Sequence, residues 1–429
     1  MRLGSSSLAA LGGEPVRRDT WPAWPRSDRS TEETVTKVLR SERWTISGPC
    51  THDLPFERRF AEAFADFHGV PYCVPTVNGS SALVIALEAL GIGPGQEVLV
   101  PGLTWVACAS AVTRIGAVPV LVDVDPQTLC ISAEAAKRAI TPSTSAIMLV
   151  HLYCMLADID QFLELSTSAG IPLIEDCSHA HGATWRGCKV GTFGTIGVFS
   201  MQQTKVLTSG EGGATITSDP ELYDRLQQLR ADGRRYSAER IPGAPELALV
   251  GDVQGHNYCL SELHAAVLLN RLPFLEHENE TRRKNATLLT RRLRPLEGIQ
   301  PLHETSSEIR PALYRYCIRF DLSSLGGASI ENVAAALSAE LGISVSTIYD
   351  PLNQNRLFHP GRSTRNSGSE DRRRSHDPAC FTLPVATAAR REVITIPHNA
   401  LLGGLAEIED IGNAVEKVLL CRNDLANLS

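Results

Sequence analysis

The sequence predicts an α/β protein built around a mostly parallel sheet. Between residues 70 and 218, short apolar runs rich in valine and isoleucine alternate with helical stretches, and Gly or Pro bounds the runs. This alternation is typical of parallel strands that are covered on both faces. The chain of 429 residues is long enough for a large core and for two or three domains.

The elements follow in order along the chain. Residues 1–30 are rich in Ser, Gly, Pro and Trp and predict an extended arm, and helical patterns cover about 31–42 and 55–69. The predicted strands are EVLVPG, VPVLVDV, AIMLVHLY, PLIEDC, TIGVFS and GATITS. Residues 219–296 read as mostly helical, with polar loops around 233–256. We therefore expect a large domain over 31–296.

The last third of the chain predicts a smaller C-terminal α/β domain over residues 297–429. It contains the strand-like run YRYCIRFDL near Tyr314, a helix around 330–341 and a final helix from about 406 to 420. The polar stretch 361–376 predicts a flexible, solvated loop, and its basic run is more typical of such a loop than of a nucleic-acid patch.

Composition excludes several classes of function. A net charge of −7 gives no electrostatic reason to bind nucleic acid or an anionic membrane, and no apolar run is long enough to span a membrane. Eleven cysteines are scattered without a C-x-x-C pair. This usage predicts reduced thiols in a cytoplasmic protein and disfavours a metal site.

The segment FSMQQTKVLTSGEGGA (199–214) carries the most chemical information. It places Lys205 between the strand TIGVFS and a glycine-rich return, with Ser200 five residues before the lysine. A lysine in a pocket that lowers its pKa becomes a nucleophile for an aldehyde cofactor. The alternative is an ordinary surface lysine on a loop.

Two segments that follow strands offer contacts for a cofactor. In VNGSSALVIAL (77–87), the turn before a helix suits a phosphate, although Asn78 and Ser80 could simply cap that helix. In PGLTWVACAS (101–110), Trp105 could stack on a flat heteroaromatic ring, or it could be a core or interface residue.

Two more segments supply polar side chains. In PLIEDCSHAHGA (172–183), Glu175 and Asp176 end a strand where ligands collect in open α/β sheets, and a carboxylate there can keep a pyridine nitrogen protonated. His179 could face the same ring, whereas His181 is less well placed. Asn257 precedes a helix that begins near Ser261 and, by sequence alone, is a loop residue.

Together these segments supply a phosphate cradle, a stacking ring, an acid for a pyridine nitrogen and a Schiff-base lysine within one α/β domain. Pyridoxal 5′-phosphate requires that combination. No Rossmann fingerprint or Walker A motif points to a rival cofactor.

Over nearly its whole length the chain resembles the DegT family of sugar aminotransferases, which are fold-type-I pyridoxal-phosphate enzymes with an aspartate-aminotransferase-like fold. Within that family it is most similar to the cyclitol aminotransferases of aminoglycoside biosynthesis that build 2-deoxystreptamine. The segments that carry the resemblance are RWTISGP (43–49), residues 72–107, LVDVDPQTLCI (121–131), IEDCSHAHGA (174–183), FSMQQTKVLTSGEGGA, GHNYCLSE (255–262) and IYDPLNQNRLF (348–358).

The resemblance implies a role for each candidate residue. Lys205 matches the lysine that holds the cofactor, Asp176 the partner of the pyridine nitrogen, Trp105 the stacking aromatic, and His179 a residue beside the ring. The implied phosphate-binding residues are Ser80, Ser81, Ser200 and, from the neighbouring subunit, Asn257. An asparagine shared in this way implies a homodimer.

Two further segments and two cysteines bear on the resemblance. The segment 43–49 and the loop from Pro351 to Asn353 match regions near the substrate. Cys154 stands where the family pattern leads us to expect glycine, and Cys259 where a polar residue is usual.

The implied reaction moves the amino group of L-glutamine to a keto-cyclitol. The expected ketone is 2-deoxy-scyllo-inosose, which gives 2-deoxy-scyllo-inosamine, and the second transamination towards 2-deoxystreptamine stays open. Other acceptors, scyllo-inosose or a nucleotide-linked keto-sugar, and the lyase chemistry of 3-amino-5-hydroxybenzoate synthases are the alternatives. Lys205 argues against the family dehydratases that carry histidine there.

Overall fold

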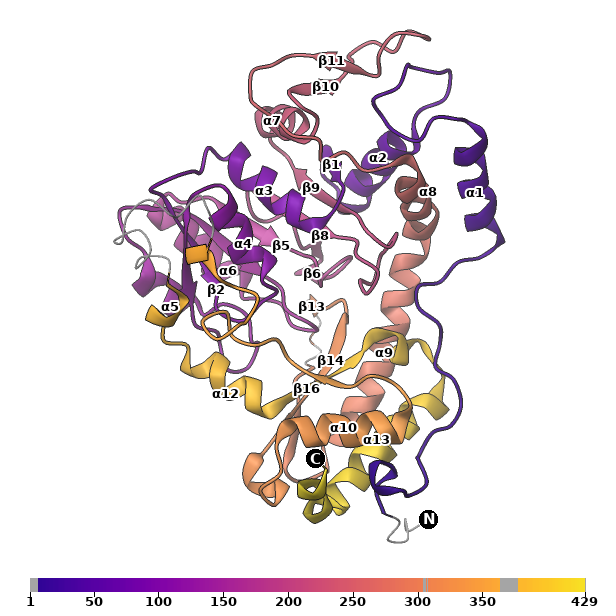
Figure 1. Cartoon of the computed structure of the whole chain (residues 1–429), viewed down its shortest axis with the longest axis vertical. Helices are drawn as coiled ribbons and strands as arrows, with labels where there is room; N and C mark the ends of the chain where they lie inside the picture. The colour runs from indigo at the N-terminus through magenta and orange to yellow at the C-terminus, as the bar shows by residue number, and fades with distance from the viewer. Residues whose placement is uncertain (1–6, 304–305, 307, 363–376, 429) are drawn as a thin grey trace.

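A seven-stranded sheet organises the first half of the computed structural model, which describes residues 7–303, 306, 308–362 and 377–428 (Figure 1). Its strand order is β1-β9-β8-β5-β4-β2-β3, and only β9 runs antiparallel to its neighbours. The strands are β1 (Tyr72–Thr76), β2 (Glu97–Pro101), β3 (Val118–Val122), β4 (Thr144–Val150), β5 (Leu173–Asp176), β8 (Ile196–Ser200) and β9 (Gly213–Thr217). The predicted α/β fold with a mostly parallel sheet is confirmed.

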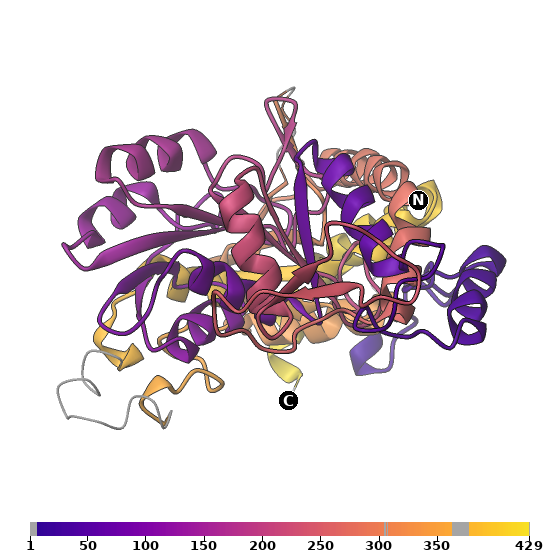
Figure 2. The same cartoon turned by 90° about the horizontal axis from the view of Figure 1, so that it is seen from above.

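Helices cover both faces of this sheet, which explains why its strands are apolar runs without polar alternation. In β2 and β5, four consecutive residues are buried. Figure 2 shows the magenta helices on one side of the sheet and indigo helices on the other. The covering helices are α3 (Gly79–Ala89), α4 (Ala107–Arg114), α5 (Ala133–Ala139), α6 (Ile159–Ala169) and α7 (Pro220–Arg230).

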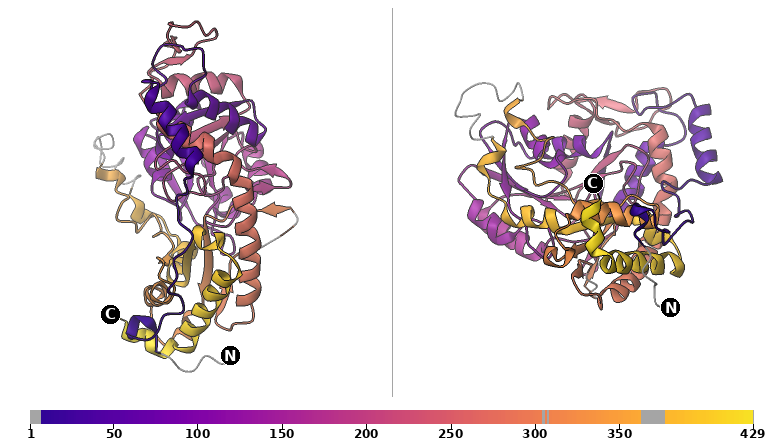
Figure 3. Two further views of the ribbon diagram at one scale, coloured as in Figure 1. Left: turned by 90° about the vertical axis from the view of Figure 1, so that its right-hand side faces the viewer. Right: turned by 60° about the horizontal axis from the view of Figure 1, so that its bottom comes forward.

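The N-terminal segment runs along the outside of the molecule from the lower sheet to the upper one (Figures 1 and 3). Arg17 fixes it to the C-terminal helix through Glu407 (2.9 Å) and Asp410 (2.8 Å). After the turn η1 (Ala9–Leu11) come α1 (Arg29–Arg40) and α2 (Phe56–His68), close to the predicted helices. Gly69 ends α2 with a φ of 72°, a conformation that favours glycine.

A second, four-stranded sheet with the order β12-β14-β16-β15 forms the lower part of the molecule. Its elements are β12 (Ile299–Pro301), β14 (Arg315–Phe320), β15 (Ser346–Thr347), β16 (Val393–Pro397), η3 (Leu322–Leu325), α10 (Ile330–Leu341), α12 (Pro384–Glu392), η7 (His398–Leu402), α13 (Leu405–Leu420) and η8 (Arg422–Asn427). The two predicted C-terminal helices are therefore confirmed as α10 and α13.

Helices connect the two sheets, and they lie where the sequence predicts mostly helical chain. They are α8 (Glu262–Arg271), η2 (Leu272–Phe274) and the long α9 (Leu275–Leu293), which descends from the upper sheet to the lower (Figure 1). The division into an arm, a large domain and a small domain at residues 31 and 297 stays a prediction. Of the predicted loop 361–376, residues 363–376 lie outside the described part of the chain.

Short strand pairs also occur outside the strands that the sequence predicts. β10 (Arg234–Tyr236) pairs with β11 (Leu247–Leu249) because Tyr236 and Leu247 pack on Ile46 in a small separate core. A second small sheet contains β6 (Thr184–Trp185), β7 (Cys188–Lys189) and β13 (Ile309–Arg310). None of the described helices combines the length and the apolar character that crossing a membrane requires.

Candidate active site

A cavity of about 500 Å³ opens where β1, β2, β5 and β8 end. Because the carboxyl ends of parallel strands share one edge of a sheet, segments distant in sequence meet there. The cavity is also lined by Tyr314 and Arg315 at the start of β14 and by Tyr349 beyond β15. Six of the residues predicted from sequence line it: Ser80, Trp105, Asp176, His179, Ser200 and Lys205.

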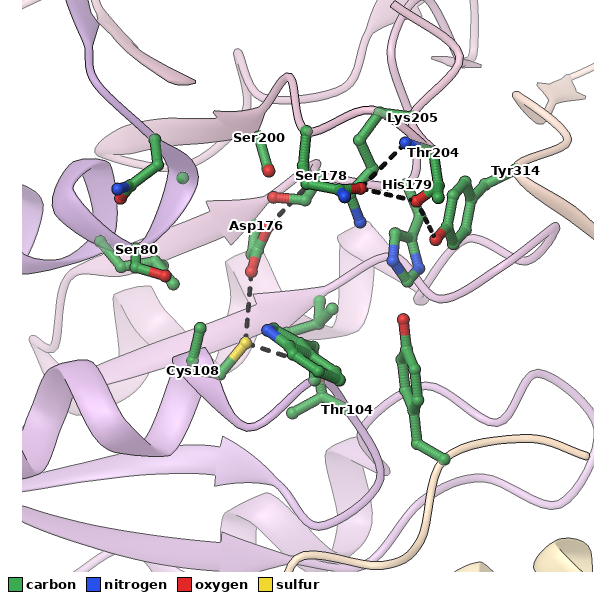
Figure 4. A pocket seen from close by; sticks show the side chains of 18 of the residues that line it. Ser80, Thr104, Cys108, Asp176, Ser178, His179, Ser200, Thr204, Lys205 and Tyr314 are labelled. Atoms are coloured by element: carbon green, nitrogen blue, oxygen red, sulfur yellow. Dashed lines mark hydrogen bonds between the residues drawn. The ribbon is translucent and has the colours of Figure 1, made fainter. Parts of the chain in front are cut away.

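Lys205 lies in a tight turn after β8 and points into this cavity (Figure 4). Its backbone N–H donates to the carbonyl of Gln202 (2.8 Å), and the residue is only 8% exposed. Burial lowers the pKa of its amine, although the nearby Tyr314 and Asp176 oppose that shift. The Nζ atom lies 4.5 Å from the centre of the Tyr314 ring. The alternative of a surface lysine is therefore wrong.

Asp176 ends β5 with its carboxylate held in place from two sides (Figure 4). Oδ1 accepts from the backbone N–H of Ser178 (3.0 Å), and Oδ2 accepts from Cys108 Sγ (3.2 Å). Burial raises the pKa of the Cys108 thiol well above its usual range, so the thiol keeps its proton and acts as the donor. Thr104 Oγ1 lies 3.4 Å from the same sulfur. This arrangement orients the carboxylate at the bottom of the cavity.

Glu175 has a structural role, which corrects the expectation that both adjacent acids serve the site. Successive side chains of a strand point to opposite faces, so Glu175 points away from the cavity. Its carboxylate accepts from three backbone N–H groups, those of Gly191 (2.9 Å), Phe193 (2.7 Å) and Gly194 (2.6 Å). His151 Nε2 and Cys177 lie near this carboxylate, as the ligands of a metal ion would. However, the three hydrogen bonds from backbone N–H groups already involve both oxygens of Glu175.

The turn before α3 lies against the end of β8 on another side of the cavity. Asn78 caps α3 by accepting from the N–H of Ser81 (2.8 Å), so the capping alternative holds for Asn78. Ser80 lines the cavity, whereas Ser81 is buried and is not among the lining residues. A Cβ atom on Gly79 would lie 2.5 Å from Cβ of Ser200. Only glycine therefore lets the helix start approach the Ser200 hydroxyl so closely.

Aromatic rings form the remaining walls. Trp105 is 48% exposed, which excludes a core role. The ring of His179 stacks on that of Tyr314, with centroids 4.0 Å apart, and its Nδ1 accepts from the N–H of Tyr153 (3.2 Å). Burial and the charge of Lys205 lower the pKa of His179 well below its usual value, so the ring is neutral at pH 7.

Cys154 and Cys259, the two cysteines that depart from the family pattern, lie outside the cavity. The left-handed residue near Cys154 is Tyr153, with a φ of 57°, and its hydroxyl accepts from the N–H of Tyr349 (2.8 Å). The half-buried Cys259 lies with Sγ 3.6 Å from the carbonyl of Arg230. Neither cysteine lines the cavity.

Asn257 does not line the cavity of its own chain in the part of the protein described. It is exposed, and the next residue, Tyr258, accepts at its carbonyl from the N–H of Val77 (2.8 Å), just before the α3 turn. The segment 43–49 and the loop from Pro351 to Asn353 are likewise absent from the lining residues. Their roles stay predictions.

Sequence reasoning missed several lining residues. Tyr314, Arg315 and Tyr349 come from the lower sheet, more than a hundred residues after Lys205, and no local motif marks them. The hydroxyl of Tyr314 lies 2.9 Å from Thr204 Oγ1, beside the lysine. Cys108 stands within the segment TWVACAS, but only its contact with Asp176 reveals a role.

The side chains fit a planar pyridine aldehyde that carries a phosphate. The amine of Lys205 and the carboxylate of Asp176 face one cavity, and Trp105 offers an exposed ring. The glycine-dependent approach of α3 to Ser200 brings a helix N-terminus and two hydroxyls together, which suits an anion. Figure 4 shows Ser80 and Tyr314 on opposite sides of the cavity.

Comparisons with known proteins agree along the whole chain. The sequence profile of the DegT/DnrJ/EryC1/StrS aminotransferase family matches residues 25–415. The L-glutamine:2-deoxy-scyllo-inosose aminotransferase of Streptomyces kanamyceticus is 47% identical, over 99% of this chain and 100% of the relative. The L-glutamine:scyllo-inosose aminotransferase of Streptomyces griseus is 46% identical, over 96% of this chain and 98% of the relative.

Among solved structures, 3-amino-5-hydroxybenzoic acid synthase superposes with a TM-score of 0.78 at 30% sequence identity. The match covers 93% of this chain and 100% of that one.

Proposed function

This chain belongs to the DegT/DnrJ/EryC1/StrS aminotransferase family, and from that membership we propose that it uses pyridoxal 5′-phosphate to move the amino group of L-glutamine to 2-deoxy-scyllo-inosose. The products are 2-oxoglutaramate and 2-deoxy-scyllo-inosamine, an intermediate of aminoglycoside antibiotics. The observation that carries the proposal is that Lys205 and Asp176 line one cavity, in a chain 47% identical to an L-glutamine:2-deoxy-scyllo-inosose aminotransferase.

Bound pyridoxal phosphate supplies an aldehyde that accepts an amino group and a ring that delocalises the electrons of the adjacent carbon. We assign its pyridine nitrogen to Asp176, whose charge keeps that nitrogen protonated. Trp105 would stack on the ring, and the neutral His179 would lie beside it. Ser80, Ser200 and the free N–H groups of α3 bind the phosphate. Ser81 contributes to the phosphate site only indirectly, because its own N–H donates to the side chain of Asn78, which caps the helix.

Lys205 is proposed to hold the cofactor and then to serve as the general base. With its pKa lowered by burial, a larger fraction of the amine is unprotonated near neutral pH and able to take the proton from the α-carbon of the amino donor. The Asp176 carboxylate, which Cys108 and Ser178 hold in place, would stabilise the positive charge of the protonated pyridine nitrogen. In the second half-reaction the same amine returns a proton to the carbon that receives nitrogen.

We also propose a homodimer in which Asn257 of one subunit reaches the phosphate of the other. The proposal rests on the resemblance to the family and on the exposure of Asn257, which leaves its side chain accessible to a second copy of the chain. A cytoplasmic location stays a prediction. The test of the dimer is its mass in solution, followed by mixing Lys205→Ala with Asn257→Ala subunits. Shared sites restore partial activity in the mixture, and independent sites restore none.

An isotope experiment tests the reaction. The holoenzyme is incubated with L-glutamine that carries ¹⁵N at its α-amino group, together with one ketone in each reaction. The ketones tested are 2-deoxy-scyllo-inosose, scyllo-inosose, the amino-dideoxy ketone of the second step and a nucleotide-linked keto-sugar. We expect one ¹⁵N in the cyclitol amine and one molecule of 2-oxoglutaramate for each amine. Loss of water from the ring without nitrogen transfer would instead indicate lyase chemistry. Preference for another ketone would refute the proposed acceptor, and no labelled amine with any ketone would refute the donor.

A further inference from the structure

The turn that carries Lys205 is held from the lower sheet as well as from its own segment. His398, the first residue of η7, directly follows β16. Its ring reaches the turn, where Nε2 lies 3.1 Å from the carbonyl oxygen of Thr204, the residue before the lysine. The proposed function gives His398 no task, although its side chain is buried. A residue almost two hundred positions later in the chain thus contacts the backbone beside the reactive amine.

This hydrogen bond determines which ring nitrogen of His398 carries the proton. A carbonyl oxygen only accepts, so Nε2 is the donor. In the described part of the chain Nδ1 of His398 has no hydrogen-bond partner. Burial and the charge of Arg282 lower the pKa of His398 well below its usual value, so the ring is neutral near pH 7. The ring of Trp24 packs against it in a T-shaped arrangement, with centroids 4.5 Å apart. His398 is therefore a neutral donor in a defined orientation.

The bond from His398 completes the support of the peptide unit that joins Thr204 to Lys205. The N–H of this unit belongs to Lys205 and donates to the carbonyl of Gln202 (2.8 Å). Its C=O belongs to Thr204 and accepts from His398. Because a peptide unit is planar, bonds to its N–H and to its C=O together restrict its rotation. The Cα atom of Lys205 lies in the same plane, so the direction in which the lysine side chain leaves the backbone depends on His398.

The lower sheet also contacts the other end of the lysine side chain. Tyr314 directly precedes β14, and the centre of its ring lies 4.5 Å from Nζ of Lys205. In the register of β14 and β16, Arg315 pairs with Pro397, the residue before His398. One strand pair therefore carries both the ring beside the amine and the donor that holds the backbone.

We propose that His398 is a positioning residue, which directs the amine of Lys205 into the cavity by holding the carbonyl of Thr204. The inference rests on the proposed function, in which the same amine holds the cofactor and moves a proton. Both tasks require the amine in one place, because a displacement of about 1 Å can lower a rate about 10²-fold. Among the described residues, those that line the cavity do not include His398, so it acts through the turn.

Two amide side chains of different length test this role. The amide nitrogen of glutamine can occupy the place of Nε2, whereas that of asparagine reaches only the place of Nδ1 and leaves the Thr204 carbonyl without its donor. Hydrogen exchange of the apoenzyme, followed at the N–H of Lys205, measures the turn directly. We expect roughly tenfold faster exchange in His398→Asn and less than about threefold faster exchange in His398→Gln.

His303→Asn is the matched control. His303 is also buried in the lower part of the molecule, but neither of its ring nitrogens has a hydrogen-bond partner among the described residues. It should lose stability in urea unfolding as His398→Asn does, and it should keep the parent's exchange rate at Lys205. Equally fast exchange in His303→Asn and His398→Asn would overturn the proposal, because general loosening would then explain the effect.

Cofactor binding and turnover give the second readout. His398→Asn should slow the association of pyridoxal phosphate with the apoenzyme and lower kcat roughly ten- to hundredfold, while the KM for L-glutamine changes less than about threefold. His398→Gln should recover most of both losses. Equal association rates and equal kcat values for the two variants would overturn the proposal, as would a change confined to KM.

The two proposals fail in different ways. If ¹⁵N from L-glutamine reaches no ketone while exchange at Lys205 depends on His398 as expected, the proposed function is wrong and the support of the turn stands. If His398→Asn transfers the label at the parent's rate and its Lys205 N–H exchanges normally, only the inference about His398 is wrong.

Discussion

The approach of α3 to Ser200 yields a prediction for Gly79→Ala. The added Cβ would lie 2.5 Å from Ser200 Cβ and 3.0 Å from Ser200 Cα, so the helix start or the end of β8 must move. Overpacking of this kind costs about 1–3 kcal/mol, whereas replacing glycine by alanine in a helix gains at most about 1 kcal/mol. The clash therefore dominates, and we expect a net loss of stability of about 1–2 kcal/mol.

The same displacement should weaken cofactor binding. An anion at a helix N-terminus is stabilised by about 0.5–2 kcal/mol, which corresponds to a roughly 2- to 30-fold change in the Kd for pyridoxal phosphate. The assays are urea unfolding of the apoenzyme and a fluorescence titration with the cofactor. Gly93→Ala is the control, because Gly93 likewise lacks a positive φ and no atom lies within 4 Å of the position that its added Cβ would occupy. Equal stability and equal cofactor affinity of the two variants would refute the reasoning.

Three further predictions address the lysine, its supporting loop and pH. Lys205→Ala should reduce the rate of transamination at least about 10²-fold, and retained turnover would contradict the assignment. The same change should raise the pKa of Tyr314, because the charge of the lysine helps to lower it, and phenolate absorbance measures that pKa. Trp24→Phe removes the hydrogen bond (3.1 Å) that the indole N–H donates to the carbonyl of the second residue before Lys205, and it should lower kcat roughly three- to tenfold. The control Trp21→Phe, which loses an indole hydrogen bond to α10, should change only stability. Equal kcat values for the two variants would contradict this prediction. Burial lowers the pKa of His68 from 6.5 to about 3, so between these values the unfolded chain binds a proton that the folded chain does not, and stability falls as the pH falls. Between pH 7 and pH 5, the free energy of unfolding of His68→Phe should therefore fall by about 2 kcal/mol less than that of the parent protein, as measured by urea unfolding. Equal losses in the two proteins would exclude His68 as a cause of the pH dependence of stability.

Much of the site could be predicted because it follows from strand order. A strand-like run that ends in Asp176, a turn that contains Ser80 and a lysine just after another strand must lie at the same edge once the strands are parallel. The sequence also carries the glycine-rich return after Lys205. These local signals lie in the upper sheet, where each strand is a short apolar run.

Other residues could not be assigned from local signals. Glu175 and Asp176 are adjacent acids, and alternation along a strand indicates only that they face opposite sides. Packing decided which one faces the cavity: the N–H groups of residues 191–194 surround Glu175, and Cys108 meets Asp176. The role of Asn257 depends on a second copy of the chain and stays a prediction.

The sequence by itself determined the mostly parallel sheet, the edge that carries the site, the lysine that faces the cavity and the pair of adjacent acids, one of which faces it. Apolar runs and helical spacing encode these features locally, and the parallel arrangement then brings their ends together. Only the tertiary structure brought the lower sheet against that edge and placed Tyr314 and Arg315 beside Lys205. Contacts between segments more than a hundred residues apart depend on how the two sheets pack, and no periodicity in the sequence records that packing.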